Sequence, residues 1–187
     1  MGIYTLLTHL FPSISFKKDV IEVEFPETHV IPELHELGEF TYNTFDKGLQ
    51  NEIAIPFWTN FKIDPDDETS EFELLFHSDD KKINQLQMEA YKSIANYSTD
   101  KWQNMLGKIW TYYQKHYSNP EYFDNRKIET IEDLKRSLKL NQLSIHKSGN
   151  VSMSFDCIWD EEHGLGVRID KNNEVTVGEA PEQIINK

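Results

Sequence analysis

The residues best suited to chemistry in this sequence lie in one short string, residues 159–167, which reads WDEEHGLGV. It contains three carboxylates and one imidazole in consecutive positions: Asp160, Glu161, Glu162 and His163. Carboxylate and imidazole groups bind metal ions and transfer protons, so one interpretation is a metal or acid–base site. Neighbouring residues of a turn cannot all face one ion, however, and no H-E-x-x-H pair accompanies them.

Two other interpretations of the string involve neither a metal ion nor proton transfer. In the structural interpretation, Trp159 belongs to the core, the acidic residues lie on a connection, and Gly164 and Gly166 allow a turn or a bulge. In the binding interpretation, an exposed acidic turn beside a tryptophan forms the edge of an interface. The sequence leaves all three interpretations open.

No other motif indicates a cofactor or a catalytic centre. Two acidic stretches, which begin at Asp64 and Asp170, lack the glycine and the closing glutamate of a calcium loop. The sequence contains no G-x-S-x-G elbow and no phosphate-binding loop. Cys157 is the single cysteine, and its strand phase predicts a small core residue that is unreactive. We therefore expect no cofactor and no bound metal.

The charge of the chain is strongly negative and unevenly distributed. The 187 residues include 19 Lys and Arg against 32 Asp and Glu, a net charge of −13. Residues 1–80 alone hold 4 basic and 17 acidic side chains, residues 81–155 have a net charge of +5, and residues 156–187 of −5. This distribution predicts an acidic surface on the first part of the molecule and a basic helical middle.

These numbers exclude several classes of function. A net charge of −13 repels phosphate, so we expect no nucleic-acid partner and no membrane partner, whereas a basic protein partner is allowed. No run approaches 18 apolar residues, and the start of the chain lacks a basic segment before its apolar part. One cysteine cannot form a disulfide within the chain, which fits the reducing cytoplasm.

The first 80 residues have the alternation of half-buried strands. Apolar residues alternate with polar ones in four runs, centred on Val23, Phe40, Ile55 and Leu74. Glutamates occupy the alternate positions in the first and last runs, as Glu22 and Glu24 and as Glu71 and Glu73. We expect antiparallel strands with one solvated, acidic face.

The middle of the chain has helical spacing instead. Apolar residues recur at intervals of three and four between residues 83 and 97, and again between residues 102 and 117. Ser98, Thr99 and Asp100 are candidate N-caps between these two helices. A shorter helix is predicted over residues 131–139, with Thr130 as its cap.

The end of the chain returns to alternation. Strands are predicted around Leu143 and Ile145, over residues 151–159, around Val167, and around Val175 and Val177. The order strands, helices, strands predicts an α+β fold, in which antiparallel N- and C-terminal strands pack against a central segment of two to three helices. We expect one domain over residues 1–187, with an acidic β-rich section (1–80), a helical section (81–140) and C-terminal β-hairpins (141–178).

The C-terminal motifs also support a family resemblance. The string Phe155-x-Cys157-x-Trp159, continued by residues 160–167 and by Val175-x-Val177-Gly178, resembles the C-terminal signature of an uncharacterised bacterial domain family of unknown function. Residues 38–57 are similar to the N-terminal part of that family. The resemblance implies strands, a helical segment and a final hairpin, and it implies no activity.

These observations favour a non-enzymatic cytoplasmic binding protein. By analogy with other small acidic proteins, we expect an immunity-type protein that neutralises a basic toxin. The candidate contacts are Trp159, the carboxylates and imidazole of residues 160–163, and Glu22, Glu24, Glu71 and Glu73. The alternatives are a metal-assisted hydrolase that uses Glu162 and His163, and a homo-oligomeric structural module. The oligomeric state and the role of residues 1–37 stay open.

Overall fold

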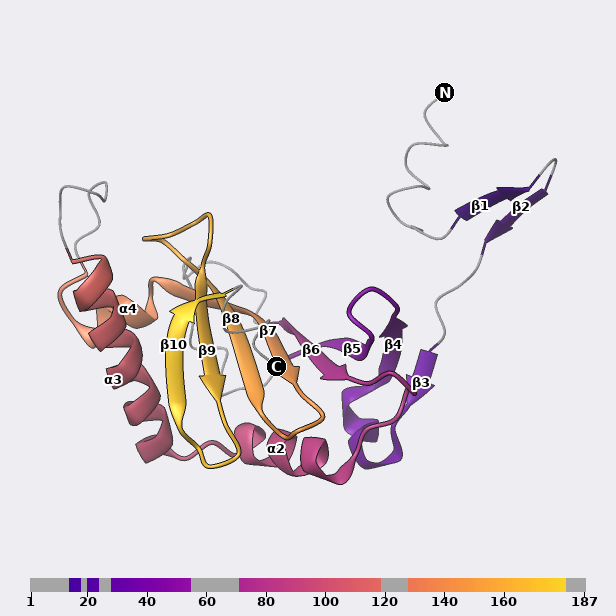
Figure 1. The fold of residues 1–187 in the computed structure, drawn as a ribbon, viewed down its shortest axis with the longest axis horizontal. Coiled ribbons are helices and arrows are strands. Elements are labelled where there is room, and N and C mark those ends of the chain that lie inside the picture. The colour runs from indigo at the N-terminus through magenta and orange to yellow at the C-terminus, as the bar shows by residue number, and fades with distance from the viewer. Residues whose placement is uncertain (1–13, 18–19, 24–27, 55–70, 119–127, 181–187) are drawn as a thin grey trace. The chain divides into compact units, whose positions relative to one another are not determined.

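A computed structural model describes residues 14–17, 20–23, 28–54, 71–118 and 128–180 (Figure 1). The chain divides into two compact units, Met1–Tyr42 and Asn43–Lys187, which are described separately below. The predicted single domain over residues 1–187 therefore stays a prediction.

The first unit consists of short strands. Strand β1 (Ile14–Lys17) pairs antiparallel with β2 (Val20–Val23), and β3 (Thr28–Val30) pairs antiparallel with β4 (Glu39–Asn43). A 3-10 helix, η1 (Pro32–Leu37), connects β3 to β4 and ends at Gly38, whose φ of 83° is readily adopted only by glycine. The strands predicted around Val23 and Phe40 are confirmed by β2 and β4.

A mixed sheet is the main feature of the second unit. Its strands are β5 (Gly48–Ile53), β6 (Phe72–His77), β7 (Leu138–Ile145), β8 (Val151–Cys157), β9 (Leu165–Ile169) and β10 (Val175–Glu179). They lie in the order β10-β9-β8-β7-β6-β5. All neighbours are antiparallel except β6 and β7, which run parallel with Phe76 opposite Ile145.

Within the described residues, three helices lie in the connection between the two parallel strands. They are α2 (Gln85–Ala95), α3 (Thr99–His116) and α4 (Ile131–Lys135). Capping side chains fix their first turns: Asn84 and Thr130 form capping boxes at α2 and α4, and Ser98 caps α3. The predicted caps Ser98 and Thr130 are therefore confirmed.

The core lies between the apolar side of the sheet and the helices. Helix α3 packs against β10, and α2 packs against β7 (Figure 1). The alternating apolar residues of β8 are buried, as predicted. Most of the apolar stripe of α3 is buried too, whereas Trp110 and Tyr117 are half-buried. The central members of this core are Phe76, Met105, Ile109, Leu143, Met153, Phe155 and Val167.

The predicted fold class is wrong. We expected antiparallel strands flanking a central helical segment, but the described chain is mostly sheet, and the strands before and after the helices are direct neighbours within it. A long connection through helices is what parallel neighbours require. The β-rich sections of residues 1–80 and 141–178 therefore meet in one sheet at β6 and β7 instead of forming separate blocks. The expectation of antiparallel strands fails at this pair.

Several local boundaries also differ from the predictions. Leu86 is 54% exposed, and its neighbour Gln87 is buried instead, so the buried face of α2 is rotated from the predicted stripe. Helix α4 ends at Lys135, and Leu138 begins β7. The predicted strand over residues 151–159 ends at Cys157. The predicted run around Ile55 and Phe57 lies largely outside the described residues.

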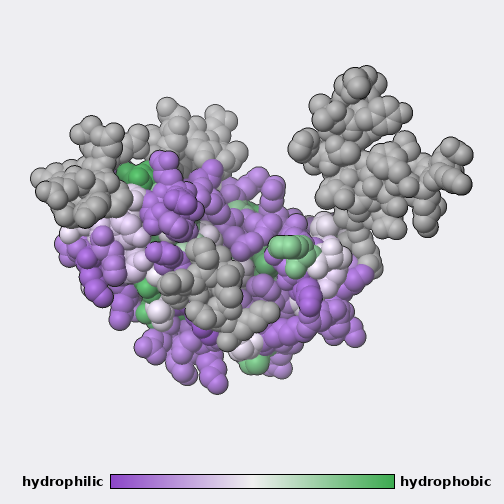
Figure 2. Space-filling view, turned by 45° about the horizontal axis from the view of Figure 1, so that its top comes forward, coloured by the Kyte–Doolittle hydropathy of each residue, from purple (hydrophilic) through white to green (hydrophobic). Residues whose placement is uncertain are grey.

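Hydrophilic side chains predominate on the face shown in Figure 2, and hydrophobic colour is confined to small separate patches. In the part of the chain that the structure describes, no helix is both long enough and apolar enough to span a bilayer.

Candidate functional site

The string that the sequence singled out forms the turn between β8 and β9, and Asp160 organises it. Its carboxylate accepts hydrogen bonds from the Tyr117 hydroxyl (2.9 Å) and from the backbone N–H of His163 (3.1 Å). Nδ1 of His163 lies 3.0 Å from the same carboxylate. The Asp160 backbone carbonyl accepts the N–H of Gly164 at 2.9 Å. One side chain thus joins the end of α3 to both sides of the turn.

These contacts shift the titration of three groups. Burial by itself raises the pKa of Asp160, but hydrogen bonds from His163 and Tyr117 outweigh it and hold the pKa of that carboxyl below its ordinary value. The hydrogen bond to Asp160 and its negative charge raise the pKa of His163. Burial and the Asp160 carboxylate raise the pKa of Tyr117, which therefore stays a neutral donor. The turn holds an ionised carboxylate at neutral pH.

The other members of the string divide into buried and exposed groups. Trp159 is buried and packs edge-on against Tyr113, with ring centroids 5.1 Å apart. Glu161, Glu162 and His163 are exposed. Gly164 has a φ of 66°, and a Cβ atom there would lie 2.6 Å from the Phe155 carbonyl oxygen, so the turn requires glycine. Gly166, by contrast, lies within β9 opposite Ser154.

Cys157 lies under this turn. Its side chain is buried, and its Sγ lies 3.4 Å from the Asp160 carbonyl oxygen, to which the thiol donates. Burial raises the pKa of the Cys157 thiol to about 12, so the reactive thiolate is disfavoured at neutral pH.

The predicted glutamates do not join this turn. Glu71 is exposed just before β6, and Glu73, within β6, is half-buried and accepts a hydrogen bond from Gln142. Strand β7 separates β6 from β8 in the sheet. Glu22 lies in β2 of the first unit, and Glu24 lies outside the described residues. The expected uniform acidic face is interrupted on β6, where the same alternation continues to Leu75, which is buried, and to His77.

Within the described residues, no group of three or more His, Cys, Asp or Glu side chains is arranged to hold a metal ion. The two residues named for a metal-assisted hydrolase, Glu162 and His163, are both exposed, and His163 is engaged with Asp160.

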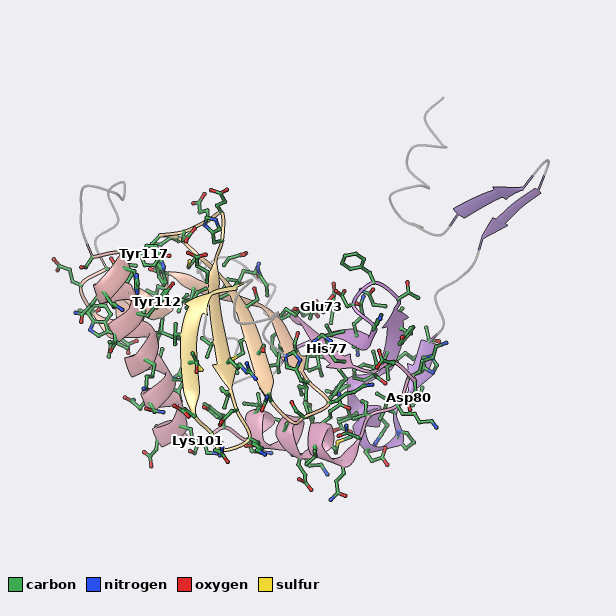
Figure 3. The ribbon with its side chains drawn as sticks, viewed as in Figure 1. Glu73, His77, Asp80, Lys101, Tyr112 and Tyr117 are labelled. Carbon is green, nitrogen blue, oxygen red and sulfur yellow. The ribbon has the colours of Figure 1, made fainter. Side chains whose placement is uncertain are left out.

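The structure reveals a second site that sequence analysis missed. A cleft of about 520 Å³ opens where the parallel strands β6 and β7 end. His77 is the last residue of β6, and His146 follows β7; their rings stack with centroids 4.5 Å apart and an interplanar angle of 10°. His146 Nε2 lies 2.9 Å from the Oγ of the buried Ser152 on β8. Figure 3 shows His77 at the opposite end of β6 from Glu73.

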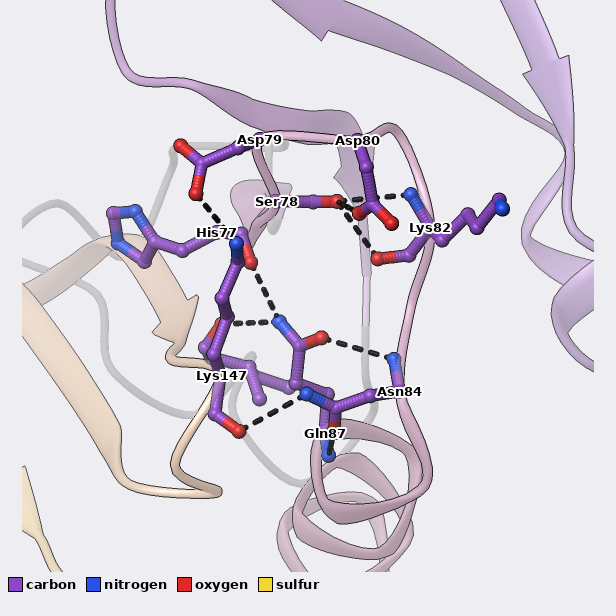
Figure 4. A network of polar contacts seen from close by, with 9 residues as sticks. His77, Ser78, Asp79, Asp80, Lys82, Asn84, Gln87 and Lys147 are labelled. Carbon is purple, nitrogen blue, oxygen red and sulfur yellow. Dashed lines mark hydrogen bonds and ion pairs between the residues drawn. The ribbon is translucent and has the colours of Figure 1, made fainter.

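A buried glutamine fixes the strand ends beside this cleft. The Gln87 side-chain amide donates to the carbonyl oxygens of His77 (2.9 Å) and Ile145 (3.1 Å), and its oxygen accepts the backbone N–H of Asn84 (3.1 Å) (Figure 4). Asn84 in turn donates to the Lys147 carbonyl oxygen at 3.0 Å. The cap of α2 and the ends of two parallel strands are thus held together by one polar network.

The remaining walls come from neighbouring loops and strands. Charged side chains line them, three basic and two acidic: Asp46, Lys47, Asp79, Lys147 and Arg168. Lys147 and Asp79 form an ion pair at 2.5 Å, and their side chains are 49% and 68% exposed. Single histidines in unrelated runs gave no signal of this cleft, because only the parallel pairing of β6 with β7 places His77 beside His146.

Comparison with known proteins defines the class of this chain without defining its activity. Residues 36–184 match the model of a domain of unknown function, DUF6985. The protein therefore belongs to the DUF6985 family, and the suspected membership of an uncharacterised domain family is confirmed. No curated protein and no solved structure matches the chain.

Proposed function

We propose that this protein is a bacterial, cytoplasmic, immunity-type binding protein that recognises a basic protein partner through the β8–β9 turn. The observation that carries the proposal is the fixed geometry of that turn. Asp160 holds the loop through Tyr117 and His163, while Glu161 and Glu162 extend into solvent. A preorganised loop loses little conformational entropy on binding, which favours affinity.

The electrostatics of the turn support the same proposal. Three carboxylates, those of Asp160, Glu162 and Glu179, raise the pKa of His163, so the negative field of this region already acts on a cation within the protein. Negative surface patches increase the association rate of basic partners, and this effect weakens as salt screens the charges. The buried, unpaired Cys157 is compatible with a reducing cytoplasm.

The proposal is tested with a synthetic lysine-rich peptide as the probe of a basic surface. Association is measured by surface plasmon resonance for the wild type and for the double variant Glu161→Gln/Glu162→Gln. We expect the variant to associate about three- to tenfold more slowly at low salt, because two steering charges are lost, and the difference to vanish in 0.5 M salt.

A charge-matched control separates this turn from the general acidity of the chain. The variant Glu89→Gln/Glu174→Gln removes the same two charges from exposed positions on α2 and on the β9–β10 connection. It should associate nearly as fast as the wild type. If both double variants slow association equally, the turn has no special role and the proposal is wrong.

A further inference from the structure

The cleft at the ends of β6 and β7 has a composition that contrasts with the whole chain. Its charged lining consists of Lys47, Lys147 and Arg168 against Asp46 and Asp79, in a protein whose net charge is −13. The stacked imidazoles of His77 and His146 add groups that donate hydrogen bonds and accept protons. The cleft is therefore a local concentration of cationic and donor groups on an acidic molecule.

The aspartates of the cleft have partners within the protein. Asp79 is paired with Lys147, and Asp46 accepts a hydrogen bond from the Asn43 side-chain amide at 2.6 Å. Because the Lys147–Asp79 pair is solvent-exposed, it contributes little to the free energy of unfolding. The Lys147 side chain can therefore reorient toward a ligand with only a small loss of favourable free energy.

The donor groups stand on positions that the fold fixes firmly. His77 ends β6 and His146 directly follows β7, its parallel neighbour, and the carboxyl ends of parallel strands are frequent ligand sites. Gln87 ties those strand ends together, and Ser152 contacts His146 from the neighbouring strand. Arg168 lies on β9 directly opposite Ser152 in the strand register. The side chains thus come from four consecutive strands of one sheet.

An exposed aromatic ring lies at the same cleft. Phe45 is 92% exposed, an unfavourable position for a phenyl group in water. Its loop is nevertheless ordered, because the Asn43 side-chain oxygen accepts the backbone N–H groups of Phe45 (2.9 Å) and Asp46 (3.1 Å). The loop is also tied to the end of β6, since Ser78 donates its N–H to the Lys47 carbonyl at 2.7 Å. A solvated phenyl ring on an anchored loop is a suitable surface for stacking a flat group.

We propose that this cleft is a binding site for a small organic anion, in which Arg168 and Lys147 bind a phosphate or carboxylate group and Phe45 stacks on a flat ring carried by the same molecule. This site is separate from the β8–β9 turn, so the test of this proposal is independent of the test for a basic protein partner. Charge-assisted hydrogen bonds from arginine provide the affinity, and the phenyl ring selects ligands with a ring.

The proposal is tested by nuclear magnetic resonance titration of the full chain with four probes: inorganic phosphate, acetate, benzoate and adenosine 5′-monophosphate. We expect saturable shifts that include the amides of His77, Lys147 and Arg168. The ring-bearing probe that shares the preferred anionic group should bind at least about tenfold more tightly than the same group without a ring. Tighter binding of adenosine monophosphate identifies phosphate as the preferred group, and tighter binding of benzoate identifies carboxylate.

Three variants assign the roles. Arg168→Gln should weaken every probe that binds by about tenfold or more, because one charge-assisted contact is lost. Lys147→Ala serves the same purpose at an exposed position where folding is not at risk. Phe45→Ala should weaken only the ring-bearing probes and leave inorganic phosphate unchanged. Lys108→Ala, on the exposed side of α3, removes the same charge outside the cleft and should change nothing.

Three results would overturn the inference. They are the absence of saturable shifts at the cleft with all four probes at millimolar concentration, equal weakening by Lys108→Ala and Lys147→Ala, and equal affinity of the ring-bearing anions and their ringless counterparts. The last result would remove the role of Phe45 and with it the proposed class of ligand.

Discussion

At the residue scale, Asp160 shows how one side chain combines a structural and an electrostatic role. Its carboxylate is mostly covered, yet three hydrogen-bond partners keep it ionised: the hydroxyl of Tyr117 and the backbone and side chain of His163. The adjacent Glu161 and Glu162 have no comparable constraint and remain exposed. The Asp160 carboxylate and the His163 imidazole therefore serve largely to stabilise the turn.

The Asp160–His163 pair predicts a dependence of stability on pH. The raised pKa of His163 means that its stabilising contribution is complete below its ordinary value of 6.5 and is lost as pH rises through the raised value. The lowered pKa of Asp160 means that its contribution is present above 3.8 and is lost as pH falls through the lowered value. Between these limits both groups are charged and the pair contributes most.

We therefore expect His163→Ala to lower the melting temperature clearly at pH 5.5 and only slightly at pH 8.5. Thermal unfolding followed by circular dichroism measures the difference. His35→Ala is the control, because His35 and its neighbour Glu36 are both largely exposed and their pairing should have little effect at either pH. Equal destabilisation by His163→Ala at both pH values would contradict the assignment.

At the element scale, the parallel pair β6 and β7 determines the architecture. The connection between these strands contains α2, α3 and α4, of which α2 packs against β7 and α3 packs against β10. Gln87 joins the first of these helices to both strand ends. A helix of the crossover connection thus holds the two strand ends that border the cleft.

This arrangement predicts the effect of Gln87→Ala. The substitution leaves the carbonyl oxygens of His77 and Ile145 without their shared donor inside the protein, so we expect a loss of about 2 kcal/mol in the free energy of unfolding. Urea denaturation measures it. Gln85→Ala is the matched control on the same helix. Gln85 is exposed, and within the described residues its side chain forms a hydrogen bond only with Glu89. A loss of similar size in both variants would refute the bridging role.

At the scale of the whole molecule, charge dominates solution behaviour. The sequence isoelectric point is about 4.9, and the net charge is −13 at pH 7. Proteins lose colloidal stability near zero net charge, because mutual repulsion then disappears.

We expect light scattering to report a monomer at pH 7.5 in physiological salt and reversible association near pH 5. The association near pH 5 should fade when the pH is raised again, because deprotonation restores the repulsive charge. A stable oligomer at pH 7.5 that persists in high salt would instead support the alternative in which this protein is a homo-oligomeric structural module.

The features that depend on near neighbours in the chain are predictable from the amino-acid sequence alone. Alternation predicted β6, β8 and β9, and helical spacing with the caps Ser98 and Thr130 predicted the three helices, because each of these patterns is complete within one segment. The family resemblance also came from local strings. The string at residues 159–163 was correctly placed between two strands, although its internal hydrogen bonds were not foreseeable.

Which strands lie side by side depends on contacts between distant parts of the chain, and these contacts are visible only in the folded structure. The pairing of Phe76 with Ile145 joins residues far apart in the sequence, and alternation specifies the faces of a strand but not its partner or direction. That pairing joins the strands before and after the helices into one mixed sheet and places His77 against His146. The Gln87 side chain that bridges the two strand ends is buried. The cleft exists because hydrogen bonding between distant strands brings together side chains that no local pattern relates.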